Sequence, residues 1–175
     1  MIKLQTPLDR KTLASLKTGD EVLLSGVLFT ARDQAHQRLA GLLKKDARLP
    51  LDLKGQIIYY CGPARKRPGR AIGSCGPTTA SRMDALTAPL LKAGLSAMIG
   101  KGRRCEAVRR LIRKHKAVYF LAIGGAGALL ARHVISSKAV AFQELGPEAI
   151  HKLAVKDFPL TVAIDSKGHN IYDIK

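Results

Sequence analysis

The chain has 175 residues, a hydrophobic fraction of 46% and a formal net charge of +17. This length suffices for a single domain, residues 1–175, with a buried core, and the hydrophobic fraction excludes a wholly disordered chain. The charge indicates an anionic partner, so nucleic acid, a membrane surface, an acidic subunit and acidic substrates are the candidates.

The cysteines argue against a metal site made by this chain alone. Cys61, Cys75 and Cys105 are odd in number and lack the CxxC spacing of zinc or cluster sites. Unpaired cysteines suit a reducing, cytoplasmic location. The first ten residues lack the apolar segment of a secretory signal, and the longest apolar run, 117–131, is shorter than the ~20 residues of a membrane helix. We therefore expect a soluble, cytoplasmic protein without a membrane partner.

Helical and strand-like segments alternate along the chain. In order, the patterns predict a helix over 8–16, a strand over 21–30, a helix over 31–45, a strand over 56–61, a basic loop over 62–73, a helix over 77–92, a strand over 95–99, a helix over 103–115, a strand over 117–123, a helix over 127–134, a strand over 138–142, and a hairpin of 160–164 with 170–174. The continuous apolar run 117–123 is typical of a strand buried on both faces. This alternation predicts an α/β fold with an antiparallel element at its C-terminus.

The segment 73–84 is a glycine- and proline-rich turn that leads into the helix over 77–92. Pro77 fits an early helical position, and Thr78 and Thr79 would then lie beside unpaired N–H groups in the positive field of the helix start. Arg82, four residues after Thr78, falls on the same helical face. The pattern predicts an anion pocket. An ordinary capped helix with a surface arginine is the alternative.

Other cations follow other predicted strands. Lys101 lies between two glycines after the strand over 95–99, and Arg32 follows the strand over 21–30. His36 comes one helical turn after Arg32, and a structural histidine is the alternative interpretation there. Ligands gather at the carboxyl ends of strands in open α/β sheets. Our hypothesis is that Arg32, Thr78, Arg82 and Lys101 converge as a cationic clamp for a small dicarboxylate.

Two glycine-rich segments resemble nucleotide-binding motifs but fit them poorly. The segment 124–127 begins a GxGxxG pattern, but Leu130 occupies the third glycine position, so a tight strand-to-helix turn explains it better. The segment 100–102 lacks the Ser or Thr that follows the lysine of a P-loop.

Several segments together resemble a known family. These are TARDQAH at 30–36, YCGP at 60–63, GPTTASRMD at 76–84 and GKG at 100–102, extended by 144–149 and 156–159. Over nearly the whole chain, the sequence resembles the β subunit, or C-terminal domain, of class I iron–sulfur fumarate hydratases and L-tartrate dehydratases. The resemblance implies the swivelling β/β/α domain of the fumarase C-terminal type. It also implies reversible hydration of fumarate to malate, with L-tartrate dehydration as the alternative.

The resemblance further implies a partner and a cofactor. In this family a [4Fe–4S] cluster acts as a Lewis acid toward the substrate, and three cysteines of the α subunit or N-terminal domain hold it. This chain would therefore bind no cluster alone, and would form a heterodimer or heterotetramer with an α subunit.

By the same resemblance, Thr78 is the base that takes a proton from the carbon next to the departing hydroxyl. A threonine hydroxyl needs its anion stabilised, which the cation Arg82 and the helix-start dipole would do. His36 matches a position treated as catalytic, and titration near neutrality would suit proton transfer there. The residues that would bind the substrate are Arg32, Thr79 and Lys101.

The basic loop 62–73 and the charge of +17 exceed what a dicarboxylate requires. An acidic face on the α subunit would account for the excess. A basic nucleic-acid-binding protein is the alternative from a different class, but aromatic residues make up only 5% of the chain and no RNP or helix-turn-helix signature stands out. We expect at most nonspecific, salt-sensitive binding to nucleic acid.

Overall fold

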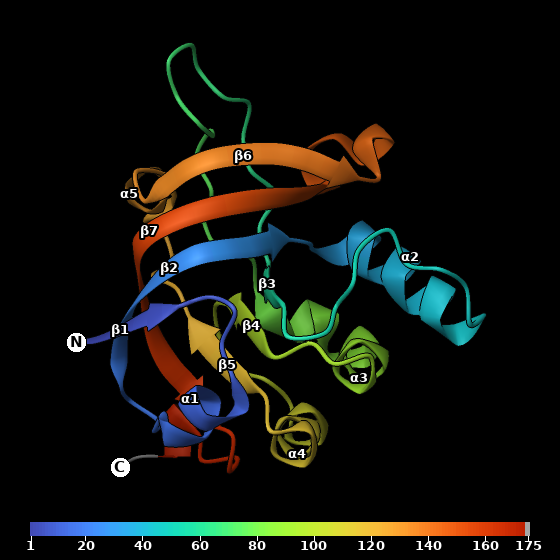
Figure 1. Ribbon diagram of the computed structural model, residues 1–175, viewed down its shortest axis with the longest axis vertical. Helices are drawn as coiled ribbons and strands as arrows, with labels where there is room; N and C mark the ends of the chain where they lie inside the picture. Colours follow the sequence, from blue (N-terminus) through green and yellow to red (C-terminus); the bar gives the residue numbers. More distant parts are fainter. Residues whose placement is uncertain (174–175) are drawn as a thin grey trace.

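A sheet of both parallel and antiparallel strands forms the centre of the molecule in the computed structural model, which describes residues 1–173 (Figure 1). Within these residues the strands are β1 (Ile2–Gln5), β2 (Glu21–Thr30), β3 (Ile57–Tyr59), β4 (Ala97–Gly100), β5 (Val118–Leu121), β6 (Val134–Ala141) and β7 (Ile150–Ile164). The α-helices are α1 (Arg10–Ser15), α2 (Asp33–Lys44), α3 (Asp84–Lys92), α4 (Glu106–His115) and α5 (Gly127–Ala131). Short 3-10 helices are η1 (Ala80–Met83), η2 (Gln143–Glu148) and η3 (Ile171–Asp173).

The strands form one sheet that closes on itself. Their order is β1-β2-β3-β4-β5-β7-β6, and an additional pairing of β2 with β7 completes a ring. One edge of β2 pairs in parallel with β1 and then β3, while its other edge pairs antiparallel with β7. The C-terminal end of β7 pairs with β5 and its N-terminal part with β6. The ring therefore contains β2, β3, β4, β5 and β7, with β1 and β6 outside it.

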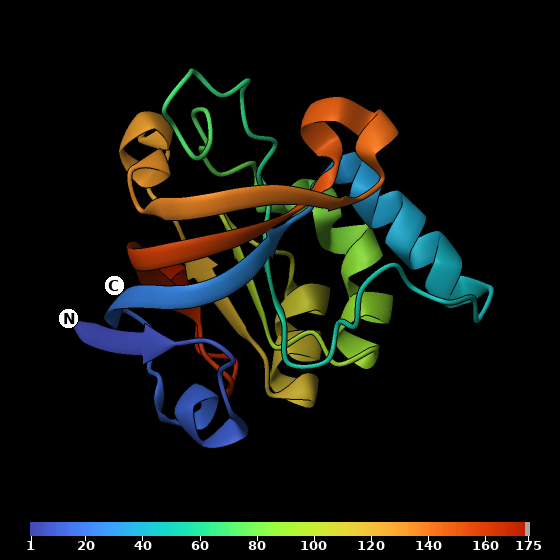
Figure 2. The same cartoon turned by 45° about the horizontal axis from the view of Figure 1, so that its top comes forward.

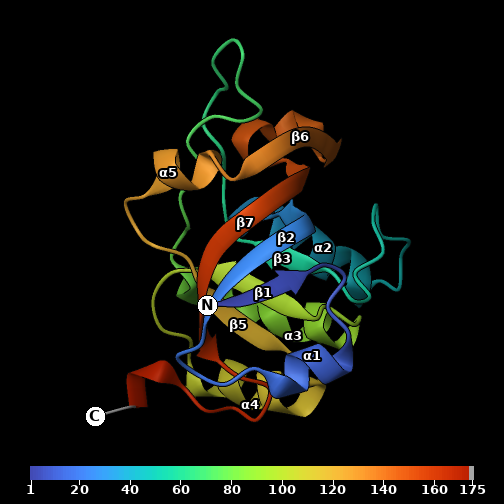
Figure 3. The same cartoon turned by 60° about the vertical axis from the view of Figure 1, so that its left-hand side comes forward.

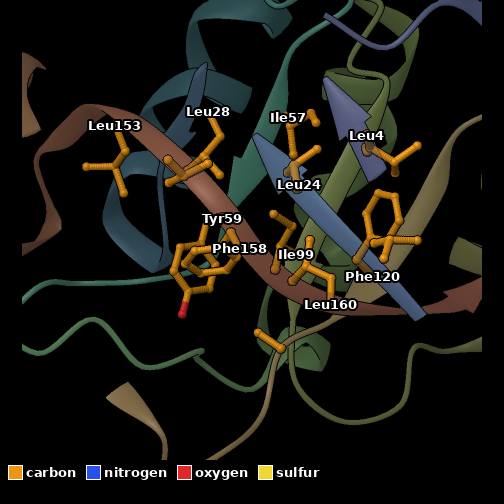
Figure 4. Packing of buried hydrophobic residues seen from close by; sticks show 14 of the residues in the cluster. Leu4, Leu24, Leu28, Ile57, Tyr59, Ile99, Phe120, Leu153, Phe158 and Leu160 are labelled. Atoms are coloured by element: carbon orange, nitrogen blue, oxygen red, sulfur yellow. The ribbon is translucent and has the colours of Figure 1, made fainter. Parts of the chain in front are cut away.

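Alternating side chains of the central strands contribute to two separate cores. Ile57 and Tyr59 of β3 pack inside the closed sheet with Leu24 and Phe158 (Figure 4). Ile58, between them, belongs to the second core under the helices. This alternation follows from the two-residue period of an extended chain. Both faces of these strands are buried, which explains their almost continuous apolar sequence.

Helices α2, α3 and α4 cover the outer face of β3, β4 and β5, and α3 lies between the other two (Figure 2). Helix α2 buries Ala35 and Leu39, and α4 buries Val108 and Ile112, each pair at the four-residue spacing of one helical face. The predicted α/β class is therefore confirmed, with a closed mixed sheet. None of the helices in the described part of the chain has the length and apolarity needed to cross a membrane.

Most predicted elements are confirmed, with small shifts at their ends. The strand over 21–30 coincides with β2, and the helices over 31–45 and 103–115 correspond to α2 and α4. The sequence patterns miss β1 and the part of β7 that precedes residue 160. The predicted strand over 170–174 is wrong, because Asn170 forms an isolated bridge to Ile164 and η3 follows directly. Residue 174 lies outside the described residues.

The helix predicted from Pro77 begins later than expected. Helical geometry starts at Ala80 with η1, and Thr79 is the residue before it. The Thr78 N–H donates a hydrogen bond to the Tyr60 carbonyl at 2.7 Å, so this part of the chain runs alongside β3 instead of coiling. The prediction that both threonines lie in the first helical turn is therefore wrong.

The basic segment 62–73 forms a loop that projects beyond the sheet (Figures 1 and 3). Near its base the Ala64 N–H donates to the Ser74 carbonyl at 2.9 Å, which joins the two arms. The loop starts directly after β3 and returns to the end of that strand at Thr78. It therefore adjoins the edge of the sheet that carries the predicted site.

Candidate active site

The predicted site residues lie at one edge of the sheet. Strands β2, β3, β4 and β5 run parallel, so their carboxyl ends meet there. Arg32 follows β2, Thr78 pairs with the end of β3, and Lys101 follows β4. Gly124, after β5, lies against Lys101, since a Cβ at that glycine would be 3.6 Å from the lysine Cδ. The fold therefore brings four strand-to-helix connections together.

Backbone hydrogen bonds hold Thr78 on both sides. Its N–H donates to the Tyr60 carbonyl at 2.7 Å, and its carbonyl accepts from the Lys101 N–H at 3.2 Å. The Lys101 carbonyl accepts in turn from the Ala80 N–H at 2.9 Å, which makes a parallel bridge between Lys101 and Thr79. Thr78 is partly exposed, and Thr79 and Lys101 are exposed. Both threonines therefore lie beside Lys101 and are at least partly accessible to solvent.

The close approach of these segments requires a glycine at position 100. A Cβ at Gly100 would lie 2.8 Å from Cδ2 of Tyr60 and 3.1 Å from the Cβ of Ala80. Any side chain at this position would push the segment that carries Thr78 away from the end of β4. Gly100 is therefore needed for close packing next to the site.

Asp33 links two of the predicted cations. Its carboxylate accepts from both Nε and Nη2 of Arg82, the Nε contact measuring 2.9 Å, and from Nε of Arg32 at 3.2 Å. Nη2 of Arg32 also pairs with Glu148 at 3.1 Å. The second carboxylate oxygen of Glu148 accepts from the Gln34 N–H at 2.7 Å, within the first turn of α2. Two-point contacts of this kind fix the orientation of a guanidinium group.

These contacts keep Asp33 ionised and leave the arginines accessible. The hydrogen bond from Arg82, opposed by burial, lowers the pKa of Asp33 from 3.8 to about 2. The same hydrogen bond raises the pKa of Arg82. The side chains of Arg32 and Arg82 remain 31% and 46% exposed. Two oriented cations are therefore open to a small anion from solvent.

His36 lies beneath this group and does not face solvent. The residue is 1% exposed, its Nδ1 lies 3.1 Å from the Arg32 carbonyl oxygen, and its ring packs edge-on against Tyr60. Within residues 1–173, the buried Nε2 has no hydrogen-bond partner. Burial lowers the pKa of His36 from 6.5 to about 4. The expected titration near neutrality is therefore wrong, and a neutral ring donates its Nδ1–H to the Arg32 carbonyl.

Arg104, which no sequence pattern singles out, anchors the segment that follows β4. Its side chain is fully buried, and its Nε pairs with Asp84 Oδ1 at 2.5 Å. Its Nη2 donates to the Thr87 hydroxyl at 2.7 Å, and its Nη1 donates to the Tyr60 hydroxyl at 3.1 Å. The sequence contains no signal that separates it from the neighbouring Arg103, which is exposed. Only tertiary packing distinguishes the two.

The cysteines of this chain do not fit an iron–sulfur cluster. Cys61 and Cys75 are buried in the core inside the sheet, whereas Cys105 is exposed before α4. A hydrogen bond with Cys75 and burial raise the pKa of the Cys61 thiol, which disfavours a thiolate ligand. Among residues 1–173, no group of three His, Cys, Asp or Glu side chains is arranged to hold a metal ion.

Comparison with known proteins gives consistent matches. The model of a family described as Fumarase C-terminus matches residues 1–174. The chain is 41% identical over 172 residues to the putative L(+)-tartrate dehydratase subunit beta of Methanocaldococcus jannaschii, covering 95% of this chain and 88% of that protein. It is 39% identical over 175 residues to fumarate hydratase 2 of Leishmania major, covering 98% of this chain and 31% of that protein. Over 162 residues it is 38% identical to the aerobic class I fumarate hydratase of Escherichia coli K12, covering 91% of this chain and 30% of that protein.

The chain thus spans less than a third of these two fumarate hydratases but most of the tartrate dehydratase subunit beta. The resemblance first drawn from short motifs is confirmed. Since the family match runs through every strand of the closed sheet and through the edge that carries Arg32, Thr78 and Lys101, the chain belongs to the Fumarase C-terminus family.

Proposed function

We propose that this protein is the β subunit of a two-subunit iron–sulfur hydro-lyase that hydrates fumarate reversibly to malate. The observation that carries the proposal is the pair of arginines, Arg32 and Arg82, which one carboxylate orients at the strand edge that also bears Thr78 and Lys101. The names of the relatives support the reaction class, because they are fumarate hydratases and a tartrate dehydratase subunit.

The cations bind the two carboxylates of the substrate in this proposal. Asp33 occupies Nε and Nη2 of Arg82, so the remaining Nη1 is the group that turns to an anion. Lys101 forms no ion pair within residues 1–173 and is exposed beside Thr79. Binding both ends of a dicarboxylate fixes its central carbons relative to Thr78, which is how positioning lowers a reaction barrier.

Thr78 acts as the base toward the substrate carbon next to the one that bears the hydroxyl. Its oxygen must be present as an alkoxide to accept that proton, and nearby positive charge favours the ionised form. The structure gives the helix dipole a smaller role than the sequence suggested, because helical geometry begins only at Ala80. Lys101, which pairs with the backbone of Thr78, and Arg82 are the cations that would favour the alkoxide.

His36 contributes by positioning. Nδ1 of its buried ring hydrogen-bonds to the Arg32 carbonyl oxygen, and a pKa of about 4 keeps the ring neutral at physiological pH. We therefore propose that His36 helps to orient Arg32 at the start of α2 and carries no proton during turnover.

An α subunit holds the [4Fe–4S] cluster in this proposal, since the cysteines of the present chain do not fit one. The two subunits form a heterodimer or heterotetramer, and the β subunit swivels against its partner to close the site. The match to a protein named as a subunit beta, of which this chain covers 88%, supports the subunit assignment in this proposal. The same match makes L-tartrate the second candidate substrate.

The test is anaerobic co-expression with a candidate α subunit that carries the three cluster-binding cysteines, followed by assays of fumarate hydration and L-tartrate dehydration. We expect Thr78→Ala to lower kcat by about 100-fold to 10,000-fold, as loss of a general base does, and Arg82→Ala to raise KM as well. Arg110→Ala, an exposed arginine on α4, is the matched control and should retain activity. Full activity in the Thr78 and Arg82 variants would refute the assignment of these residues.

A further inference from the structure

A groove lies between the basic loop and the neighbouring outer strand. We call it the basic groove. Its cavity has a volume of about 660 Å³. Its walls are the loop, helix α5 and the start of β6, which adjoin one another in Figures 1 and 3. The residues that define it here are Arg65, Arg67, Arg70, Arg132, Val134 and Ile135.

The positive charge of the basic groove is uncompensated. Within residues 1–173, none of its four arginines forms an ion pair, and no aspartate or glutamate lines the cavity. Six other arginines, Arg32, Arg38, Arg82, Arg104, Arg109 and Arg110, pair with carboxylates. Four more within residues 1–173, Arg10, Arg48, Arg103 and Arg113, form no ion pair, but they do not line this cavity. Four unpaired arginines around one concave surface provide charge complementarity for an acidic ligand.

Exposed aliphatic side chains accompany this charge. Ile135, at the start of β6, lines the groove and is 61% exposed, and Leu129 on α5, outside the groove lining, is 47% exposed. A protein interface typically combines an apolar centre with a charged or polar rim. Sites for single-stranded nucleic acid instead rely on aromatic platforms, and none of the aromatic residues within 1–173 lines this groove. The composition therefore favours an acidic polypeptide over a single-stranded nucleic acid, and duplex DNA is left to the test.

Backbone contacts connect the walls of the basic groove to the segment that leads to Thr78. The Cys75 N–H donates to the Gly127 carbonyl at 3.1 Å, which joins the returning arm of the loop to the start of α5. These two segments of the chain lie so close together that a Cβ at Gly127 would be 2.8 Å from the Gly76 nitrogen. Gly124, three residues before α5, lies against Lys101. The start of α5 therefore connects a wall of the basic groove to the edge that carries Thr78.

We propose that the basic groove docks an acidic segment of the cluster-bearing α subunit, with an aliphatic side chain of that segment packed on Ile135. The inference rests on the proposed function for the identity of the partner. It assigns a role to the basic loop that binding of a dicarboxylate leaves unexplained. It also accounts for charge in excess of what the substrate needs.

The test compares two double charge reversals made in the full-length protein. Arg70→Glu with Arg132→Glu alters the groove, and Arg110→Glu with Lys114→Glu alters the exposed face of α4 by the same net charge. Binding to the purified candidate α subunit is measured by surface plasmon resonance at low and high salt, under anaerobic conditions. We expect the groove variant to raise Kd by about 100-fold or more with a slower association rate, and the control to stay within about 3-fold. Thermal unfolding of both variants verifies that they fold.

The outcomes separate this proposal from the proposed function. Equal weakening by both variants would mean that bulk charge drives binding and would overturn the docking site. An unchanged Kd in the groove variant, or failure of the wild type to bind, would overturn it as well. Loss of duplex-DNA binding in the groove variant alone, with α-subunit binding intact, would assign the groove to nucleic acid and also overturn it. A complex that forms through the groove but lacks hydro-lyase activity would refute the function while the docking site stands. If the complex is active and the groove substitutions leave its affinity unchanged, the proposed function stands and the docking site is refuted.

Discussion

Replacement of Asp84 by asparagine tests whether a buried ion pair supports the candidate site. The Arg104 side chain is fully buried and that of Asp84 is 13% exposed, so water screens the pair poorly. Asparagine keeps the size of the side chain, and its carbonyl oxygen can still accept the Cys105 N–H that Asp84 now binds at 2.9 Å. The substitution therefore removes the charge while preserving the shape.

We expect Asp84→Asn to lower the free energy of unfolding by about 3–5 kcal/mol, because removing one partner leaves a buried charge without compensation. The hydroxyls of Thr87 and Tyr60 continue to accept hydrogen bonds from Arg104 but do not neutralise it. For a domain of this length, each kcal/mol corresponds to about 2–4 °C in Tm, so the expected decrease is about 6–20 °C.

Circular dichroism during thermal and urea unfolding at neutral pH measures this loss. Glu106→Gln is the matched control, because it removes a carboxylate from an exposed pair in which Nε of Arg110 lies 3.5 Å from Glu106. Exposed pairs contribute about 0–1 kcal/mol, so the control should change stability little. Adding Arg104→Met to Asp84→Asn should recover part of the loss, since the unpaired charge then disappears. Similar small losses for Asp84→Asn and Glu106→Gln would refute the reasoning.

Three further predictions concern close packing and pH. Gly100→Ala should lower the free energy of unfolding by about 1–3 kcal/mol, because the new Cβ overpacks against Tyr60. Gly41→Ala, in open space on α2, should raise that free energy by about 0.5–1 kcal/mol. Denaturant titration of both variants measures these changes, and equal effects would contradict the packing argument. The pKa of His36 is 6.5 in the unfolded chain and about 4 in the folded protein. Between pH 6.5 and 4 the unfolded state therefore binds more protons than the folded state. As the pH falls through this range, the folded protein loses about 3 kcal/mol of stability. His36→Phe should flatten that part of a pH–stability curve, and an unchanged slope would show that His36 is accessible to protons when folded. Asp33 stabilises the fold above pH 3.8, and this contribution is lost as the pH falls toward 2, so acid unfolding of Asp33→Asn should be less steep there than that of the wild type.

Local sequence patterns predict the elements whose structure depends on near neighbours. The strand former content of 21–30 and the apolar run that becomes β5 suffice to identify those strands. The first part of β7 carries polar residues, a left-handed residue at Asp157 with φ of 49°, and Pro159, all of which argue locally against a strand. It is extended because β2 and β6 pair with it from distant parts of the chain. Pairing of this kind cannot be deduced from composition.

The same distinction applies to the candidate site. The positions of Arg32 and Lys101 at the sheet edge could be predicted because each follows a predicted strand, and Thr78 could be proposed from the glycine- and proline-rich turn that precedes η1. The protonation state of His36 could not, because it depends on how deeply the fold buries the ring. The ion pair of Arg104 likewise depends on packing between α3 and the segment after β4, and nothing in the basic sequence around it signals burial.

The closing strand has a consequence for how the protein is made. Glu21 pairs with Thr161 and Phe29 with Lys152, so the second edge of β2 is paired only after about 130 further residues have been synthesised. Contacts between such distant residues slow folding. Until β7 emerges, the nascent chain exposes one unpaired edge of β2, the kind of edge that attracts chaperones or aggregates. The order of synthesis therefore makes β7 the strand that closes this sheet last.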